Sequence, residues 1–147
     1  MPDDEPLEAR IGKAMHRLLE WGALSAQGTA AVAREFELSP AQGARAAELA
    51  TSILQGAGAW AWDPAVIEWA GNEVGISWRG QYRQIDRLVL RRDGQWWVLD
   101  YKTAAAPQAQ AELRAQLTDY RAAVQALYPD HVVRAAFLTP QGVVLEL

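Results

Sequence analysis

Two acidic residues and one lysine have the residue types and the spacing that metal-assisted chemistry requires. Asp86 lies in the run 81–91, and Asp100 and Lys102 lie near the end of the run 96–103. Both runs are rich in apolar and β-branched or aromatic residues, which predicts β-strands. Residues two apart in a strand point to the same face, so Asp100 and Lys102 are expected to project together.

A turn signal between the two runs predicts that Asp86 folds back beside the other two residues. The Asp-Gly pair at 93–94 is a strong indication of a β-hairpin. A hairpin centred on this pair is expected to place Asp100 near Leu88 and Asp86 near Lys102, with all the charged groups on one face. Two carboxylates and an ammonium group would then meet on an otherwise apolar pair of strands.

Burial alone gives no reason for such a trio. Charged side chains are seldom buried unless they are paired or bind a metal. A simple Asp–Lys ion pair at the end of a sheet is the structural alternative. Mg²⁺ prefers oxygen ligands and needs only one or two carboxylates beside a phosphate, and a nearby lysine adds positive charge to the transition state. The three residues therefore suggest a site for metal-dependent hydrolysis of phosphodiesters.

Elements on both sides of this hairpin complete the predicted fold. Hydrophobic spacing predicts helices over 7–22, 29–38, 39–54 and 108–127. Further strands are expected over 73–78, 132–138 and 143–147, whereas 60–71 is ambiguous, with a short helical turn expected at Asp63-Pro64. A strand–helix–strand passage such as 96–138 normally makes its two strands parallel. The expected fold is α/β, with a mixed central sheet flanked by helices.

Composition narrows the class of protein. The 147 residues, half of them hydrophobic, suit one compact domain. The absence of cysteine excludes disulfides, a thiolate nucleophile and iron–sulfur clusters. The net charge of −4 argues against a free-standing protein that grips nucleic acid by bulk electrostatics. No stretch of about 18 apolar residues occurs, so we expect a cytoplasmic protein with no membrane partner.

Four motifs in a fixed order resemble the nuclease domain of RecB- and AddA-type helicase–nucleases, members of the PD-(D/E)XK superfamily. An Ile-Asp-Arg-Leu strand and an Asp-Tyr-Lys-Thr strand end form the centre of the resemblance. A Gly-x-x-x-His-x-x-Leu-Glu helix comes before them, and a Gln-x-x-x-Tyr helix follows. In this chain the motifs are residues 12–20, 85–88, 100–103 and 116–120.

The resemblance implies a role for each matched residue. Asp86 and Asp100 would bind Mg²⁺ or Mn²⁺ through their carboxylates, and the backbone carbonyl of Tyr101 would be a further ligand. His16 would reach the same metal from the first helix. Lys102 would orient the attacking water and stabilise the transition state. Taken alone, a histidine beside an apolar stripe is more often a core residue than a ligand.

Four other residues are candidates for supporting roles. Gln116 and Tyr120 lie one turn apart on one face of a predicted helix, and the resemblance implies that they shape the rim of the site or touch DNA. Without the resemblance, Gln116 and Tyr120 would be ordinary helix residues. Glu20 is expected either to form a surface ion pair or to orient the imidazole of His16. Glu73 is expected either to assist the site or to lie exposed at a sheet edge.

Arginines and tryptophans offer a second, weaker indication of nucleic-acid binding. The arginines recur every four residues on the strand face opposite Asp86, where they would contact phosphates, a partner domain, solvent or a covering helix: Arg79, Arg83, Arg87 and Arg91. Among the seven tryptophans, the Trp60/Trp62 pair is the one expected to be exposed.

Taken together, the resemblance implies a restriction-endonuclease-like domain over 1–147 that hydrolyses DNA. It further implies a carboxy-terminal piece of a UvrD/RecB-like helicase–nuclease that degrades DNA ends, more as an exonuclease than as an endonuclease, in double-strand break repair and recombination. Partners would be DNA, the covalently linked helicase domains and a second helicase–nuclease subunit. The chain has no Gly-x-x-x-x-Gly-Lys-Ser/Thr loop, so ATP would be a ligand of the parent helicase only.

Three other functions compete with an active nuclease. A catalytically silent nuclease-like module would bind DNA or brace a helicase complex, but it has no chemical need for Asp86, Asp100 and Lys102 together. A Mg²⁺-dependent phosphatase on a similar sheet would hydrolyse small phosphate esters. A purely structural interaction domain would leave the co-facing acids unexplained.

Overall fold

The computed structural model describes residues 5–22 and 24–147. Within these ranges the helices are α1 (Leu7–Trp21), α2 (Ala26–Glu35), α3 (Pro40–Leu54) and α4 (Ala111–Leu127). The strands are β1 (Ile67–Trp78), β2 (Gln81–Arg91), β3 (Trp96–Tyr101), β4 (Val133–Leu138) and β5 (Val144–Glu146). Two short 3-10 helices are η1 (Ala59–Trp62) and η2 (Pro107–Ala109). No helix of the described residues is long and apolar enough to cross a membrane.

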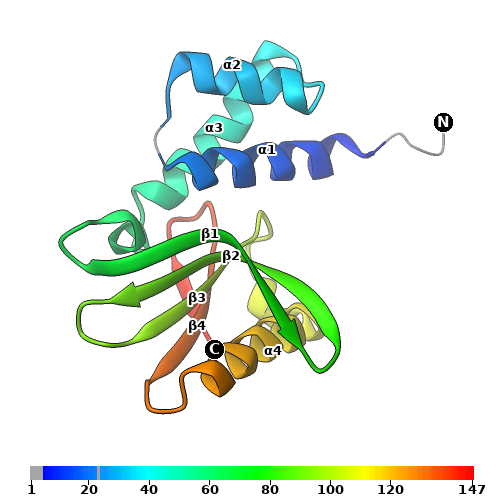
Figure 1. Cartoon of the computed structure of the whole chain (residues 1–147). Coiled ribbons are helices and arrows are strands. Elements are labelled where there is room, and N and C mark those ends of the chain that lie inside the picture. Colours follow the sequence, from blue (N-terminus) through cyan, green and yellow to red (C-terminus); the bar gives the residue numbers. More distant parts are fainter. Residues whose placement is uncertain (1–4, 23) are drawn as a thin grey trace.

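The five strands of the described chain form one mixed sheet in the order β1-β2-β3-β4-β5. Only β3 and β4 are parallel, and they are joined through α4, as the strand–helix–strand passage predicts. Helices α1, α2 and α3 lie on one face of the sheet and α4 lies on the other (Figure 1). The expected α/β fold with a mixed, helix-flanked sheet is confirmed.

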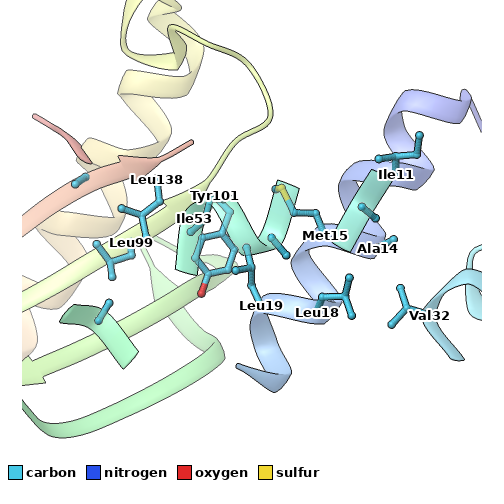
Figure 2. Close-up of a cluster of buried hydrophobic side chains, with 14 of the residues drawn as sticks. Ile11, Ala14, Met15, Leu18, Leu19, Val32, Ile53, Leu99, Tyr101 and Leu138 are labelled. Atoms are coloured by element: carbon cyan, nitrogen blue, oxygen red, sulfur yellow. The ribbon is translucent and has the colours of Figure 1, made fainter. Parts of the chain in front are cut away.

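Alternation along β3 divides the interior into two cores. Leu99 and Tyr101 face the helical layer, where they join Met15, Leu18 and Leu19 of α1 in a fully buried cluster (Figure 2). The intervening strand positions face α4, so that all six residues of β3 are buried. Strand β3 is thus packed on both faces, and Asp100 and Lys102 lie at its carboxyl end.

Capping explains where the first helices begin and end. Gly22 ends α1 in the left-handed conformation with φ of 71°, a conformation that glycine adopts without strain. Ser25 caps α2, since its Oγ accepts from the amide of Gly28 at 2.9 Å, and α2 therefore begins three residues before the expected 29. Ser39 and Gln42 form the reciprocal capping box that fixes the start of α3.

The boundaries of β1 and α4 differ from the expected ones. Strand β1 starts at Ile67 rather than at 73, and it uses most of the segment that looked ambiguous. A turn follows Asp63, whose carboxylate accepts from the amide of Ala65 at 2.9 Å. The helix expected over 108–127 starts only at Ala111, because the 3-10 turn η2 occupies the residues before it.

The register of the β2–β3 hairpin differs by two residues from the expected one. Leu88 lies opposite Val98, and the same register carried onward brings Asp86 opposite Asp100 rather than Lys102. The loop spans three residues, 92–94, and is closed by a hydrogen bond from the amide of Arg91 to the carbonyl of Gln95, which accounts for one position of this shift. The two carboxylates are thus closer to each other than a two-residue turn predicts.

A kink crosses β1 and β2 at Glu73 and Asp86. Just before the kink, Asn72 donates a hydrogen bond to the backbone of α1. Val74, two residues later, packs instead into the core between the sheet and α4. Regular alternation would put both on the same face. Glu73 adopts a positive φ of 50°, and the paired ladder skips Glu73 and Asp86. The kink turns Asp86 out of the regular pattern and towards α1.

Two helix glycines give a matched test of how tightly α2 and α3 pack. A Cβ atom on Gly43 would lie 2.8 Å from the Cβ of Ala33, whereas one on Gly12 would meet nothing nearer than 3.8 Å. We expect Gly43→Ala to destabilise the fold by about 1–2 kcal/mol, because overpacking outweighs the gain in helix propensity. Gly12→Ala should be neutral or stabilising by up to about 1 kcal/mol. Urea unfolding measures both, and equal effects would contradict this packing.

Candidate metal centre

Three side chains from three elements converge at the carboxyl end of β3. His16 comes from the middle of α1, Asp86 from the kink in β2 and Asp100 from the end of β3. One donor atom from each residue lies within 4.8 Å of the other two. Among the described residues this is the one group of histidine and acidic side chains that meets the geometry of a metal site. We call these three residues the metal centre.

The imidazole of His16 is held by the helix on which it lies. Its Nδ1 donates to the carbonyl of Gly12 at 2.9 Å, which leaves Nε2 3.1 Å from Oδ2 of Asp86. In the neutral tautomer two lone pairs would therefore face each other, unless a proton or a cation lies between them. Burial opposes the charged ring, but hydrogen bonding and attraction to Asp86 outweigh it and raise the pKa of His16.

Asp86 is stabilised in its charged form. Burial would raise the pKa of this carboxyl group, but its contacts with His16 and Asp100 and a hydrogen bond from the backbone prevail and lower it. The backbone donor is the amide of Tyr101, 2.9 Å from Oδ2. The β3 backbone thus contributes directly to positioning a carboxylate from β2.

Asp100 has the opposite electrostatic situation. Burial, and then the neighbouring carboxylate of Asp86, raise its pKa to about 8, although Lys102 opposes the shift. Its Oδ2 is buried and makes no hydrogen bond. The Nζ atom of Lys102 lies 3.3 Å from that oxygen, close enough for an ion pair but without hydrogen-bond geometry. An unsatisfied buried carboxylate oxygen is costly unless a cation or a proton completes its coordination.

These residues fit a divalent cation. Octahedral coordination at about 2.1 Å places neighbouring ligands about 3 Å apart and opposite ligands about 4.2 Å apart. The donor atoms, within 4.8 Å of one another, need only a small inward movement to reach these values. Two carboxylates and an imidazole supply the hard and borderline ligands that Mg²⁺ or Mn²⁺ accepts.

Metal binding should release protons, and its affinity should therefore depend on pH. Near neutral pH Asp100 is protonated in the metal-free protein, because its pKa is raised to about 8. A metal requires the carboxylate of Asp100 and the neutral imidazole of His16, whose pKa is also raised, so we expect affinity to rise with pH up to about 8 and to level off above it. Calorimetry in buffers of different ionisation enthalpy measures the release. Affinity that is constant between pH 6 and 8 would contradict the raised pKa.

Tyr101, Gln116 and Tyr120 are the other residues for which the resemblance implies a role at the metal centre. The Tyr101 side chain points into the helical core (Figure 2), where its ring lies 5.4 Å from the ring of His16, and its backbone amide donates to Asp86. Tyr120 is buried in the α4 core, and burial, followed by the negative charge of Asp100, raises its pKa. Gln116 lies one turn earlier on α4 and is half-buried. Their roles as a carbonyl ligand and as rim residues remain predictions.

An open cleft of about 560 Å³ leads to the metal centre. Its lining combines positively and negatively charged side chains with one phenylalanine: Lys13, His16, Arg17, Glu20, Phe36, Glu73, Gln84 and Asp86.

Glu20 pairs with Arg17 at 2.9 Å and makes no hydrogen bond to the imidazole of His16, which the Gly12 carbonyl orients instead. Burial, then repulsion from Asp86, raises the pKa of Glu73, so this acid lies within electrostatic reach of the site.

Several residues at the cleft were not identified from the sequence. Lys13 and Arg17 share with His16 and Glu20 the spacing of one helix face, and this polar stripe was the available signal. Gln84 lies two residues before Asp86 and lines the same cleft. The contribution of the Tyr101 amide had no sequence signal, because any residue there offers the same N–H group.

The expected arginine face is partly internal. Arg87 is buried, donates to the carbonyl of Ala61 and to Asn72, and lies 4.8 Å over the ring of Trp62. Trp60 and Trp62 are half-buried and pack against the helical core, so the prediction of an exposed tryptophan pair is wrong. The two tryptophans are half-buried because they cover the sheet and, in the case of Trp62, the buried guanidinium of Arg87.

A mixed sheet that brings together an aspartate from β2, an aspartate and a lysine from the end of β3 and a histidine from the first helix has the residue types of a metal-dependent phosphodiesterase site. The family model of the PD-(D/E)XK nuclease superfamily matches residues 1–144, and the chain belongs to that superfamily. The fold agrees with the restriction-endonuclease-like core of such nucleases. No curated protein matches the chain. Membership indicates a nuclease that uses a divalent metal.

Proposed function

We propose that this chain hydrolyses phosphodiester bonds in DNA with Mg²⁺ or Mn²⁺ bound by His16, Asp86 and Asp100. The carbonyl of Tyr101 is the proposed fourth protein ligand. The observation that carries the proposal is the convergence of three donor atoms within 4.8 Å, beside a lysine and at the end of an open cleft. Superfamily membership supplies the reaction class.

Each residue has a role that follows from its contacts. A bound divalent cation supplies Lewis acidity and lowers the pKa of a water molecule. Asp86 and Asp100 balance the charge of the cation, and His16 is presented with its Nε2 free because Gly12 accepts from Nδ1. Lys102 offers an ammonium group 3.3 Å from Asp100, where it orients the attacking water and stabilises negative charge on the phosphate oxygens.

We further propose that the domain works exonucleolytically on DNA ends within a UvrD/RecB-like helicase–nuclease, in double-strand break repair and recombination. The net charge of −4 supports delivery of DNA by other domains or by a second subunit, since the chain has little bulk attraction for a polyanion. ATP would then be used by the parent helicase alone. A cytoplasmic location agrees with such a role.

Cleavage of end-labelled linear DNA in Mg²⁺ or Mn²⁺ tests the nuclease proposal. We expect the wild type to degrade linear DNA faster than a closed circle of the same sequence and to leave p-nitrophenyl phosphate intact. Asp86→Asn should be inactive, whereas Asp130→Asn, at an exposed site far from the cleft, should cleave like the wild type. Turnover of the small ester without DNA cleavage would instead identify a phosphatase. A protein that binds no metal and cuts neither substrate would indicate the silent module.

A further inference from the structure

Strands β1 and β2 extend well beyond the rest of the sheet. Pairing of β2 with β3 covers Arg87 to Leu90, whereas pairing with β1 continues to Trp78 opposite Gln81. Residues 74–85, here called the hairpin arm, therefore project past β3 from the kink at Asp86, next to α4 (Figure 1). An arm that starts at a metal ligand and leaves the body of the domain is placed to touch whatever enters the site.

The hairpin arm has one apolar face and one open face. Val74, Ile76 and Ile85 pack towards α4 and anchor the arm. The opposite face carries Tyr82 and Gln84 with the small residues Gly75 and Ser77 across from them, and all four are exposed. The same face continues at Gln84 into the cleft that Asp86 lines. The arm thus presents a nearly flat shelf that leads to the metal centre.

Tyr82 has the features of a stacking platform. Its side chain is 68% exposed, the largest exposure among the large hydrophobic and aromatic residues described. Its ring lies over Gly75, where an added Cβ atom would meet the phenol oxygen at 2.5 Å. Gln84 also approaches that oxygen, at 3.4 Å. The phenol end of the ring is therefore held against the arm, and most of the side chain is open to solvent.

The charge of the hairpin arm is opposite to that of the whole chain. Residues 74–85 contain two arginines and no acidic residue, in a protein of net charge −4. Arg79 lies exposed at the tip, 5.2 Å over the ring of Trp78. Arg83 is half-buried and faces Tyr120 of α4, where its charge opposes the rise that burial and Asp100 cause in the phenol pKa. A polyanion is the ligand that this local charge favours.

We propose that the open face of the hairpin arm binds one unpaired strand of DNA and leads it to the metal centre, with a base stacked on Tyr82 and a phosphate near Arg79. This proposal rests on the proposed nuclease function and adds the element that selects the substrate. A flat exposed ring can stack on a base only when the base is not enclosed in a duplex, and such stacking is tolerant of sequence. Tyr82 lies four strand residues from Asp86, about 13 Å away, so the platform holds the strand a few nucleotides from the cut.

Fluorescence anisotropy with a labelled 20-nucleotide single strand and the matching duplex, in EDTA so that no cleavage occurs, tests the arm directly. We expect the wild type to bind the single strand more tightly, and Tyr82→Ala to lose about 5- to 100-fold in that affinity. Tyr82→Phe, which keeps the ring, should bind like the wild type. Gly75→Ala should also weaken binding, because its methyl group displaces the ring.

Controls separate this inference from the nuclease proposal. Arg79→Ala should weaken binding and flatten its salt dependence, whereas Arg45→Ala, at an exposed site on α3, should do neither. Calorimetric Mn²⁺ binding should be unchanged in Tyr82→Ala, which shows that the metal centre is intact. If Tyr82→Ala and Gly75→Ala bind the single strand like the wild type, the arm proposal is wrong, and cleavage by the wild type still decides the nuclease proposal. Equal losses for single strand and duplex would overturn the stacking role.

Discussion

Lys102→Ala is expected to slow DNA cleavage by about 10²- to 10³-fold while leaving metal affinity nearly unchanged. Removal of one positioned group that stabilises charge in a transition state has an effect of that size. Lys102 has no donor atom for a metal, and its ammonium group stands 3.3 Å from Asp100 at the edge of the centre. Single-turnover cleavage of labelled DNA, with calorimetry of Mn²⁺ binding on the same protein, measures the two effects separately.

Two further variants show whether the loss belongs to the reaction. Lys102→Arg keeps the positive charge and should restore part of the rate, although its planar group differs in geometry. Lys13→Ala removes the other lysine of the chain, which pairs with Glu5 at the mouth of the cleft. This control should change the cleavage rate by less than about tenfold, as a peripheral charge does. Equal rate losses for Lys13→Ala and Lys102→Ala would contradict a specific role for Lys102.

Asp100→Asn is expected to reduce affinity for Mg²⁺ and Mn²⁺ by at least about 100-fold and to abolish cleavage. The carboxylate is the most buried of the three proposed side-chain ligands, and its Oδ2 has no hydrogen-bond partner in the protein. An amide keeps the shape but loses the charge that balances a divalent cation, and even indirect partners of metal ligands contribute about 10- to 100-fold to affinity. Calorimetry at pH 8 measures the loss.

The same substitution should stabilise the protein in the absence of metal. Folding raises the pKa of Asp100 from about 3.8 to about 8, so the folded state holds a proton that the unfolded state releases. The contribution of Asp100 to the stability of the wild type therefore falls as pH rises between these values. Asparagine has no such proton, so its advantage over the wild type should grow from pH 5 to pH 8 in urea unfolding with EDTA. A variant that is less stable than the wild type at pH 8 would contradict the raised pKa.

Local patterns predicted the elements that carry the site. Helical spacing located α1, the Ser39-Pro40 start located α3, and the Asp-Gly turn identified the hairpin that brings Asp86 to Asp100. The structure brings together His16, Asp86, Asp100 and Lys102, although His16 and Lys102 lie 86 positions apart in the sequence. Alternation alone paired Asp100 with Lys102, but only the resemblance to known nucleases connected His16 with them.

Features that depend on tertiary contacts were not accessible from the sequence. The three-residue loop at 92–94 shifted the register, since an Asp-Gly pair fits more than one loop length. The kink at Glu73 and Asp86 needs packing on both sides, with Asn72 bonded to α1 and Val74 in the α4 core. The hairpin arm follows from that kink, and no local spacing indicates how far two strands extend beyond a third.

The anomalous difference map of a crystal soaked in Mn²⁺ tests the metal centre most directly. We expect a peak within about 2.3 Å of His16 Nε2 and of one oxygen each from Asp86 and Asp100, as coordination at about 2.1 Å requires. The peak should be absent from crystals of Asp100→Asn treated in the same way. No peak at saturating Mn²⁺, or a peak elsewhere in the cleft, for instance between Glu20 and Glu73, would contradict the proposed centre and with it the mechanism built on these residues.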